Sequence, residues 1–240
     1  MSVARIESEA LVVRTVEVGE SDVIATLVTE QIGKIAAVAR GARKGSRRVG
    51  GALEPVHTIG VMLDDKGTDV ATLKEARIVR MRAGVVSDLD ALEAAGGALR
   101  WARHLFPPRH REPQGWHVLT SLLDLLDARP AGSAGAAWSR KHLAHAGFAM
   151  LAAVGYGLDL ERCVVCSRPC PEGKPAFIDP GRGGLVCRSC GGAAQVMPAA
   201  VRAAAKALAE GRFDAVTDAH AEALLAIVDR AMAAHAGFER

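Results

Sequence analysis

The sequence predicts an α+β protein in which a small β-domain precedes a helical domain. Five short runs rich in Val, Ile and Thr fill the first eighty residues, helix-forming residues dominate after Arg82, and two Cys-x-x-Cys pairs lie late in the chain. At 240 residues the chain is long enough to bury the core of one or two domains. We place the domain boundary between residues 80 and 81, with a cysteine-containing insert at 161–192 inside the helical domain.

The five runs of the first domain have the composition and the boundaries of short strands. They cover residues 10–16, 22–29, 33–40, 56–63 and 69–79, and clusters of Gly, Asp and Ser separate them. Residues 19–22 and 64–67 have the composition of hairpin turns, so neighbouring strands are expected to be antiparallel. Five such strands form a small barrel or sandwich.

Apolar residues at helical spacing predict helices in the second domain. The expected helices cover 88–106, 113–128, 133 to about 155, 198–211 and 218–237, and Ser133 is the expected N-cap of the third. We place Asp124 and Asp127 on the solvated face of their helix. His142 and His145 lie one turn apart, and we interpret them as packed or hydrogen-bonded residues because no third metal ligand lies nearby in sequence.

The overall charge does not identify a partner. A net charge of +3, from 30 basic and 27 acidic residues, is too small to imply a polyanion by itself, so only local clustering carries that inference. Residues 1–10 contain Arg5, Glu7 and Glu9 and no apolar run, from which we expect no signal peptide and a cytoplasmic protein. The longest uncharged stretch, 142–158, is too short to span a membrane.

The cysteines have the spacing of a four-thiolate zinc site. Cys163 and Cys166 form one Cys-x-x-Cys pair, Cys187 and Cys190 form the other, and 20 residues separate the pairs. Four protein ligands leave no position for water, so the predicted zinc is structural. The fifth cysteine, Cys170, lies between two prolines and could replace Cys166, although the rigidity of proline favours a bystander.

A basic segment, residues 34–48, begins in the third predicted strand and continues into the long connection after it. No acidic residue occurs between Glu30 and Glu54, and glycines are interleaved with the cations. The candidate DNA-binding residues are Lys34, Arg40, Arg43, Lys44, Arg47 and Arg48. Charge runs are often only solvated, but this one belongs to a small β-domain, which favours a contact with a nucleic-acid backbone.

The β-domain has no ring on which a base could stack. No Phe, Tyr or Trp occurs between Met1 and Arg100. Base stacking on aromatic side chains contributes about 1–3 kcal/mol per base in proteins that hold single strands tightly. Binding is therefore expected to depend on phosphate neutralisation, to be similar for single and double strands, and to weaken steeply with salt.

Catalytic signatures are absent from the sequence. There is no Walker loop, Gly-x-Ser-x-Gly elbow, His-Glu-x-x-His motif or dinucleotide fingerprint. We therefore expect no enzyme and no small-molecule substrate. The alternative is a zinc-ribbon adaptor that contacts proteins without binding DNA directly.

Several segments resemble the RecO family of bacterial recombination mediators in DNA repair. They are residues 10–14, 18–22, 28–34, 38–44, 52–55, 158–163 and 184–190. The resemblance covers most of the chain and is most specific in the first eighty residues and around the cysteines.

This resemblance implies an N-terminal five-stranded OB-fold β-barrel, an α-helical bundle domain and a four-cysteine zinc-binding insert. It further implies a protein that binds single- and double-stranded DNA and anneals complementary strands. The implied partners are RecR, RecA and the tail of the single-strand-binding protein. Lys34, Arg40, Arg43 and Lys44 lie in the matching motif and take its DNA-binding role, whereas Arg47 and Arg48 lie just beyond it.

Overall fold

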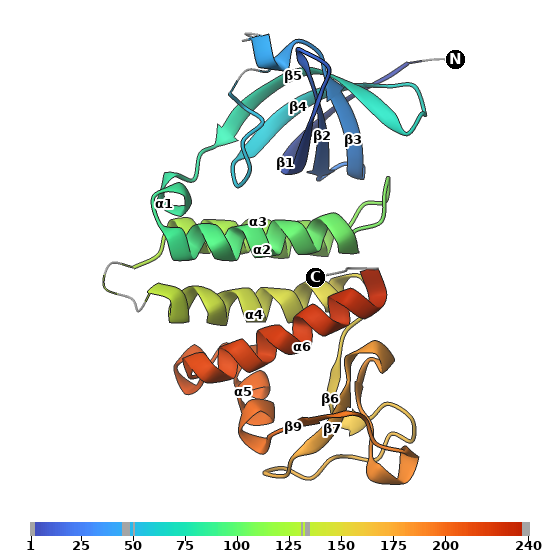
Figure 1. Ribbon diagram of the computed structural model, residues 1–240, viewed down its shortest axis with the longest axis vertical. Helices are drawn as coiled ribbons and strands as arrows, with labels where there is room; N and C mark the ends of the chain where they lie inside the picture. Colours follow the sequence, from blue (N-terminus) through green and yellow to red (C-terminus); the bar gives the residue numbers. More distant parts are fainter. Residues whose placement is uncertain (1–2, 45–48, 50, 131, 133–134, 237–240) are drawn as a thin grey trace. The chain divides into compact units, whose positions relative to one another are not determined.

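The chain folds into two compact units, residues 1–128 and 129–240. The computed structural model describes residues 3–44, 49, 51–130, 132 and 135–236. The first unit contains a β-barrel and three helices, and the second contains three helices and a small sheet (Figure 1). The first compact unit therefore includes the helices of residues 83–127 together with the barrel. The predicted domain boundary at 80/81 instead marks the change from strands to helices, and this division into domains stays a prediction.

Five strands close into a barrel in the first unit. They are β1 (Ala4–Val18), β2 (Asp22–Thr29), β3 (Gly33–Ala39), β4 (Thr58–Asp65) and β5 (Val70–Arg80), in the order β1-β2-β3-β5-β4. Strands joined by hairpins are antiparallel, as the turn residues predicted. β3 and β5 pair in parallel, because barrel closure joins two strands that are not consecutive in the chain. This connectivity confirms the predicted α+β fold with an OB-type barrel.

Alternation along β3 decides which side chains face outward. Ile35, Ala37 and Ala39 are buried in the barrel core, and the residues between them are half-exposed. Side chains alternate between the two faces of a strand, so Lys34 lies on the outer face with Ala36 and Val38. The same period continues to Arg40, which follows β3 and is exposed.

Three helices complete the first unit: α1 (Ala83–Val86), α2 (Leu89–Leu105) and α3 (Pro113–Asp127). They pack against one another, and α2 also contacts β1 and β2. Asp88 caps α2 by accepting a hydrogen bond from the Ala91 amide at 2.9 Å. The boundaries of α2 and α3 match the predicted helices to within one residue.

The prediction that Asp124 and Asp127 lie on a solvated helix face is wrong. Asp124 Oδ1 accepts a hydrogen bond at 2.8 Å from Nε of Arg82, whose side chain is 1% exposed. Asp127 Oδ1 accepts from the Gly84 amide at 2.8 Å and so caps the start of α1. Both carboxylates pair with groups more than 40 residues away, which no local pattern reports.

The second unit combines α4 (Gly135–Ala153), α5 (Ala199–Ala209) and α6 (Asp218–Ala236) with a four-stranded sheet. The sheet contains β6 (Asp159–Cys163), β7 (Ala176–Asp179), β8 (Gly184–Leu185) and β9 (Gln195–Met197), in the order β6-β8-β7-β9. It contains the predicted insert and extends a few residues beyond each end of it. Ser133, the expected N-cap of α4, lies outside the described residues.

The two histidines of α4 are packed and hydrogen-bonded, as predicted. The His142 ring lies 4.2 Å from the Trp138 ring and 4.3 Å from the Phe213 ring, measured between centroids. Nδ1 of His145 donates to the Leu208 carbonyl at 3.0 Å. Within the described ranges, no helix combines the length and the apolarity that crossing a bilayer requires.

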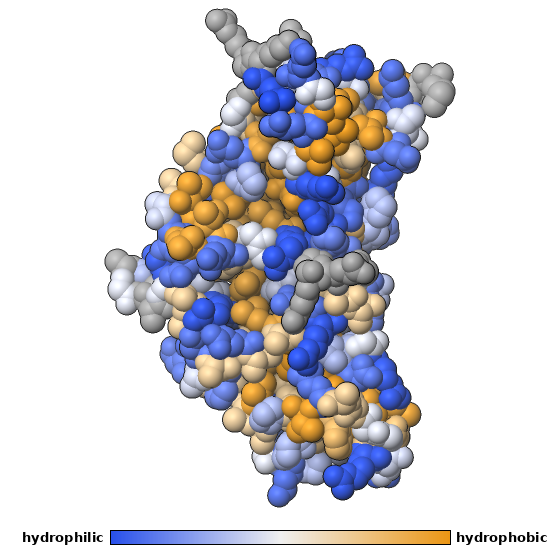
Figure 2. Space-filling view, viewed as in Figure 1, coloured by the Kyte–Doolittle hydropathy of each residue, from blue (hydrophilic) through white to orange (hydrophobic). Residues whose placement is uncertain are grey.

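α2 differs in character between its two ends. Figure 2 shows an apolar patch over α1 and the start of α2, where Met81, Val86 and Leu89 are 63%, 54% and 71% exposed. Arg100 and Arg103 lie near the other end of α2, about 17 and 21 Å along the helix axis from Leu89 at 1.5 Å per residue. Any cationic surface formed by α2 is thus separate from this apolar patch.

Substitutions in the Arg82–Asp124 pair should strongly lower the stability of the first unit. Asp124→Asn removes the carboxylate that faces a buried guanidinium, so we expect a loss of about 3 kcal/mol in the free energy of unfolding. Glu93→Gln, an exposed change on α2, should stay within about 0.5 kcal/mol of the parent protein. Urea denaturation followed by circular dichroism measures both; equal stability of the two variants would contradict a structural role for the pair.

His142 should make the protein sensitive to mild acid. Burial, and then the charges of His145 and Lys141, lower the pKa of His142 from 6.5 to about 4. Between these values the unfolded chain binds a proton that the folded chain does not, so stability should fall as pH falls from 6.5 towards 4. His142→Phe keeps an aromatic ring and should flatten this dependence, whereas His117→Gln, an exposed control, should not. Thermal unfolding across this pH range checks it, and parallel profiles for His142→Phe and the parent would refute it.

Candidate nucleic-acid interface and metal centre

The structure brings together the four cysteines that the spacing predicted as ligands. The Sγ atoms of Cys163, Cys166, Cys187 and Cys190 all lie within 4.8 Å of one another. Sγ of Cys166 lies 3.8 Å from Sγ of Cys187, far beyond the length of a disulfide bond. A tetrahedral zinc with bonds of about 2.3 Å to sulfur places its ligands about 3.8 Å apart. The cluster therefore has the dimensions of a four-thiolate zinc site.

Hydrogen bonds from backbone amides stabilise a thiolate in this cluster. The amide of Cys187 donates to Sγ of Cys163 at 3.3 Å, and this bond is the first of several that lower the pKa of Cys163 to about 6. The neighbouring thiols, Cys187 first and then Cys166, raise the pKa of Cys190 to about 12. One thiolate is thus stabilised while a fully ionised set repels itself, and a bound dication removes that repulsion.

Each Cys-x-x-Cys pair turns tightly on backbone hydrogen bonds. In the second pair, the amide of Gly192 donates to the carbonyl of Cys187 at 3.1 Å, and Gly191 has a φ of 96°. This left-handed conformation is one that glycine adopts without steric cost. In the first pair, the amide of Ser167 donates to the carbonyl of Cys163 at 2.8 Å, and Ser167 takes a φ of 59°. Both turns aim two sulfurs at one centre.

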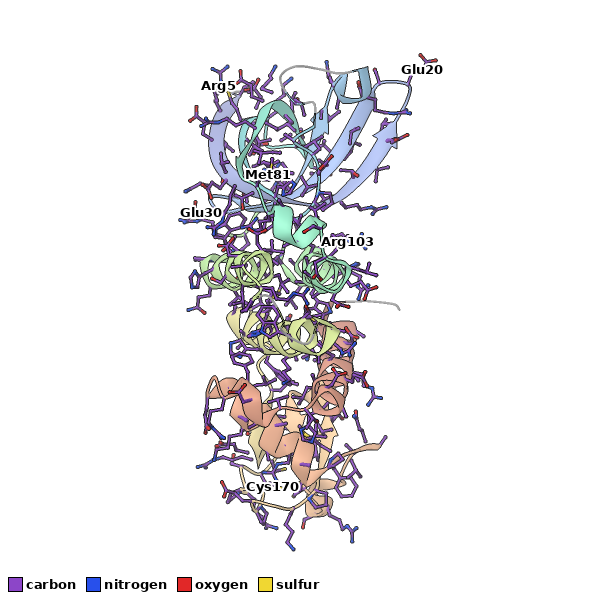
Figure 3. The ribbon with its side chains drawn as sticks, turned by 90° about the vertical axis from the view of Figure 1, so that its left-hand side faces the viewer. Arg5, Glu20, Glu30, Met81, Arg103 and Cys170 are labelled. Atoms are coloured by element: carbon purple, nitrogen blue, oxygen red, sulfur yellow. The ribbon has the colours of Figure 1, made fainter. Side chains whose placement is uncertain are left out.

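Cys170 belongs to a different contact. It is not part of the four-sulfur cluster, and its Sγ accepts a hydrogen bond at 3.1 Å from Nη1 of Arg202. The same guanidinium donates to the carbonyls of Pro171 and Lys174, at 3.0 and 2.9 Å. Arg202 therefore fixes the loop before β7 to α5, and Cys170 does not replace Cys166 in the cluster. Figure 3 labels Cys170 among the side chains of the second unit.

Two described cations of the basic segment, Arg40 and Arg43, follow the end of β3. Arg40 is exposed, and no ion pair involves it in the described part of the chain. Arg43 and Lys44 belong to the turn η1 (Ala42–Lys44), whose first residue follows Gly41. Arg47 and Arg48 lie outside the described residues.

Arg43 is exposed but has a carboxylate partner. Its Nη2 lies 3.2 Å from Oε2 of Glu17, and its Nη1 donates to the carbonyl of Gly19 at 3.3 Å. The side chains of Arg43 and Glu17 are 40% and 69% exposed, and an ion pair of this kind contributes about 0–1 kcal/mol. A phosphate that approaches Arg43 therefore competes with a weak contact.

Lys34 lies apart from these residues, near the start of β3. Its Nζ donates to the carbonyl of Arg103 at 2.5 Å, and burial and then the charge of Arg103 lower the pKa of Lys34. The amide of Arg109 in turn donates to the Lys34 carbonyl at 2.8 Å. Lys34 thus joins β3 to the end of α2, a contact that sequence proximity does not suggest.

Profile comparisons decide the family. Residues 1–82 match the model described as "Recombination protein O N terminal", and residues 86–240 match "Recombination protein O C terminal". The chain belongs to the RecO family. The N-terminal barrel is accordingly the OB-fold of a RecO protein, and the family places the chain in DNA repair.

Curated RecO relatives are similar over most of their length. The chain is 36% identical over 214 residues to the DNA repair protein RecO of Anaeromyxobacter sp. (strain Fw109-5), covering 86% of the chain and 80% of the relative. It is 34% identical over 237 residues to that of Anaeromyxobacter dehalogenans (strain 2CP-C), covering 98% and 87%. The Myxococcus xanthus (strain DK1622) protein is 34% identical over 211 residues, covering 86% and 82%.

Metal analysis should distinguish the cluster from Cys170. We expect about one zinc ion per chain in the parent protein, and at least a tenfold loss of zinc affinity in Cys166→Ser and Cys187→Ser because each removes a ligand. Cys170→Ser is the matched control and should keep its zinc. Mass spectrometry of metal content after dialysis measures this; full occupancy in Cys187→Ser, or loss in Cys170→Ser, would exclude the assignment.

Proposed function

We propose that this RecO-family chain is a non-enzymatic recombination mediator. It binds single- and double-stranded DNA through phosphate contacts, anneals complementary strands and assists the loading of RecA together with RecR. The observation that carries the proposal is the acid-free basic segment at the end of β3 on an OB barrel, with Arg40 and Arg43 exposed. The barrel and the family support DNA as the polyanion.

Phosphates are the part of DNA that this surface can hold. The barrel has no aromatic side chain to stack on a base, and arginine binds phosphate oxygens through paired hydrogen bonds. Lys34, Lys44, Arg47 and Arg48 complete the proposed set of contacts with Arg40 and Arg43. Contacts of this kind position the backbone without reading sequence.

Annealing follows from the same chemistry. Two complementary strands repel through their phosphates, and a cationic surface that neutralises both leaves the base edges free to pair. A surface that stacked the bases would compete with pairing. The absence of aromatic residues from the barrel therefore suits annealing.

The second unit has a structural role in this proposal. A zinc ion held by Cys163, Cys166, Cys187 and Cys190 stabilises the small sheet, and the chain acts in the cytoplasm, where thiols stay reduced. RecR and the tail of the single-strand-binding protein are the proposed protein partners, and we assign no residues to either.

One observation favours the adaptor alternative. Val164 and Val165, between the first two cysteines, are 36% and 51% exposed, so the turn presents apolar side chains to a partner. The two functions differ in their dependence on metal. A protein stripped of zinc that keeps its DNA affinity but loses its protein partner would assign protein contacts to the zinc site, and a metal-loaded protein without any DNA binding would favour the adaptor.

Salt titration tests the DNA contact. Arg40→Gln and Arg43→Gln should each reduce the slope of log affinity against log salt by about 0.7 for single strands and about 0.9 for duplexes, because each removes one phosphate contact. Arg77→Gln, an exposed change on β5, is the matched control and should leave the slope unchanged. Fluorescence anisotropy at several salt concentrations measures the slopes. An unchanged slope in both variants would remove the basic segment from the contact.

Annealing gives a second readout on the same variants. The rate at which complementary strands pair should rise when the parent protein is added and fall with added salt. The Arg40→Gln/Arg43→Gln double variant should show a smaller rise. Single-strand binding without any salt-sensitive increase in the annealing rate would contradict the proposed mechanism.

A further inference from the structure

A second group of cations lies where the barrel meets α2. The group consists of Arg14 on β1, Lys34 on β3, and Arg100 and Arg103 on α2 (Figure 3 labels Arg103). Arg14 and Arg100 are exposed, and Lys34 and Arg103 are half-exposed. These residues are up to 89 positions apart in sequence, so the fold alone assembles them.

Strand register places Arg14 on the same barrel face as Lys34. Arg14 pairs with Thr26 of β2, and Thr26 pairs with Ala36 of β3. Side chains directly opposite each other across a sheet share a face, and Ala36 shares the outer face with Lys34. Two strand spacings of about 4.8 Å put the backbone of Arg14 about 10 Å from β3.

Backbone contacts hold the end of α2 against this face. The Lys34 ammonium donates to the Arg103 carbonyl, and the loop after α2 returns to β3 through the bond from the Arg109 amide to the Lys34 carbonyl. A Cβ at Gly33 would overlap the carbonyl oxygen of His110, so only glycine permits this approach. The position of Arg103 relative to β3 is therefore built into the fold.

The group brings like charges together. The Arg103 guanidinium donates to Nε2 of His104 at 2.7 and 3.1 Å, which requires a neutral imidazole. Burial lowers the pKa of His104, and the charges of Arg103, Lys34, Arg100 and Arg14 lower it further, in that order. Four cations thus act on one ring. Lys34 and Arg103 repel each other in the free protein, and a bound polyanion offsets this repulsion.

The outer face of β3 links this group to Arg40, which follows the other end of the strand. Lys34 and Arg40 are six residues apart, or about 20 Å at 3.3 Å per residue. Ala36 and Val38 lie between them on that face, and Thr26 lies beside them on β2. These side chains are uncharged and small, so they neither repel a phosphate nor block its approach. One strand of B-DNA places about six phosphates along this length.

We propose that the DNA backbone runs from Arg40 along the outer face of β3 to the end of α2, where Arg14, Arg100 and Arg103 bind its phosphates. The inference rests on the proposed function and extends its contact surface beyond the OB barrel. It assigns a DNA-binding role to a helix outside the barrel and to a cation on β1.

Single substitutions within the folded protein test the path. Arg14→Gln and Arg103→Gln should each lower the single-strand salt slope by about 0.7, and Arg77→Gln should not. Arg103→Gln keeps the backbone carbonyl that Lys34 uses, so the end of α2 stays in place. Combining Arg103→Gln with Arg40→Gln should lower the slope by the sum of the two changes, because one DNA molecule contacts both ends.

The outcomes separate this inference from the proposed function. If Arg40→Gln and Arg43→Gln lower the slope but Arg14→Gln and Arg103→Gln do not, the path along α2 is wrong and the basic segment still binds DNA. If the parent protein does not bind DNA, or binds it with an affinity that does not depend on salt, both this inference and the proposed function are wrong. A loss of affinity in Arg103→Gln with an unchanged slope and a lower melting temperature would assign Arg103 a structural role and overturn the path.

Discussion

The buried guanidinium of Arg82 connects α3 to the chain at the start of β4, which follows the basic segment. It donates to the Val56 carbonyl at 2.6 Å, to the Thr58 hydroxyl at 3.0 Å and to Asp124 of α3 at 2.8 Å. Val56 has a φ of 69°, which is unfavourable for a β-branched residue. A buried cation without a partner is strongly destabilising, so the barrel depends on the carboxylate that α3 supplies. The helices of the first unit are thus part of the structure that supports the proposed DNA-binding face.

Charge on the barrel is segregated between its strands. At the end of β4, Asp64 pairs with Arg5 and Lys74, and Asp65 pairs with Arg109, which lowers the pKa of Asp65. The outer face of β3 has only basic charged residues, Lys34 and Arg40 at its two ends. The small net charge of +3 is therefore compatible with a cationic face, because the acidic residues pair with basic residues on another part of the same barrel.

A metal held by the four cysteines would support a sheet whose strands are very short. β8 and β9 contain two and three residues, and strands this short bury little apolar surface. A dication bound by the four thiolates would join two turns that are 20 residues apart, and Arg202 attaches the adjoining loop to α5. Charged hydrogen bonds thus add to helix packing in the second unit, and metal coordination is the proposed third contribution.

Local chemistry was sufficient to predict the elements and the cysteine site. The period of apolar residues located four of the five strands and the main helices to within two residues, because side-chain alternation and helical spacing are properties of the backbone itself. β1 begins at Ala4, six residues before the expected strand. The cysteine spacing predicted that four sulfurs lie together, because each two-residue spacer folds into a tight turn that brings its two cysteines close. The basic segment was visible because its cations lie close together in the chain.

Tertiary structure alone decided the long-range charge partners. Asp124 has the spacing of a solvated helix residue and becomes the partner of a buried arginine 42 positions away. Arg14 and Arg103 carry no distinguishing signal in sequence and meet Lys34 only after β1, β2 and β3 are in register and α2 is docked. Periodicity determines which face of a helix or strand a side chain occupies. The charged group that lies opposite that side chain comes from a distant element, because Coulomb interactions depend on distance in space and not on position along the chain.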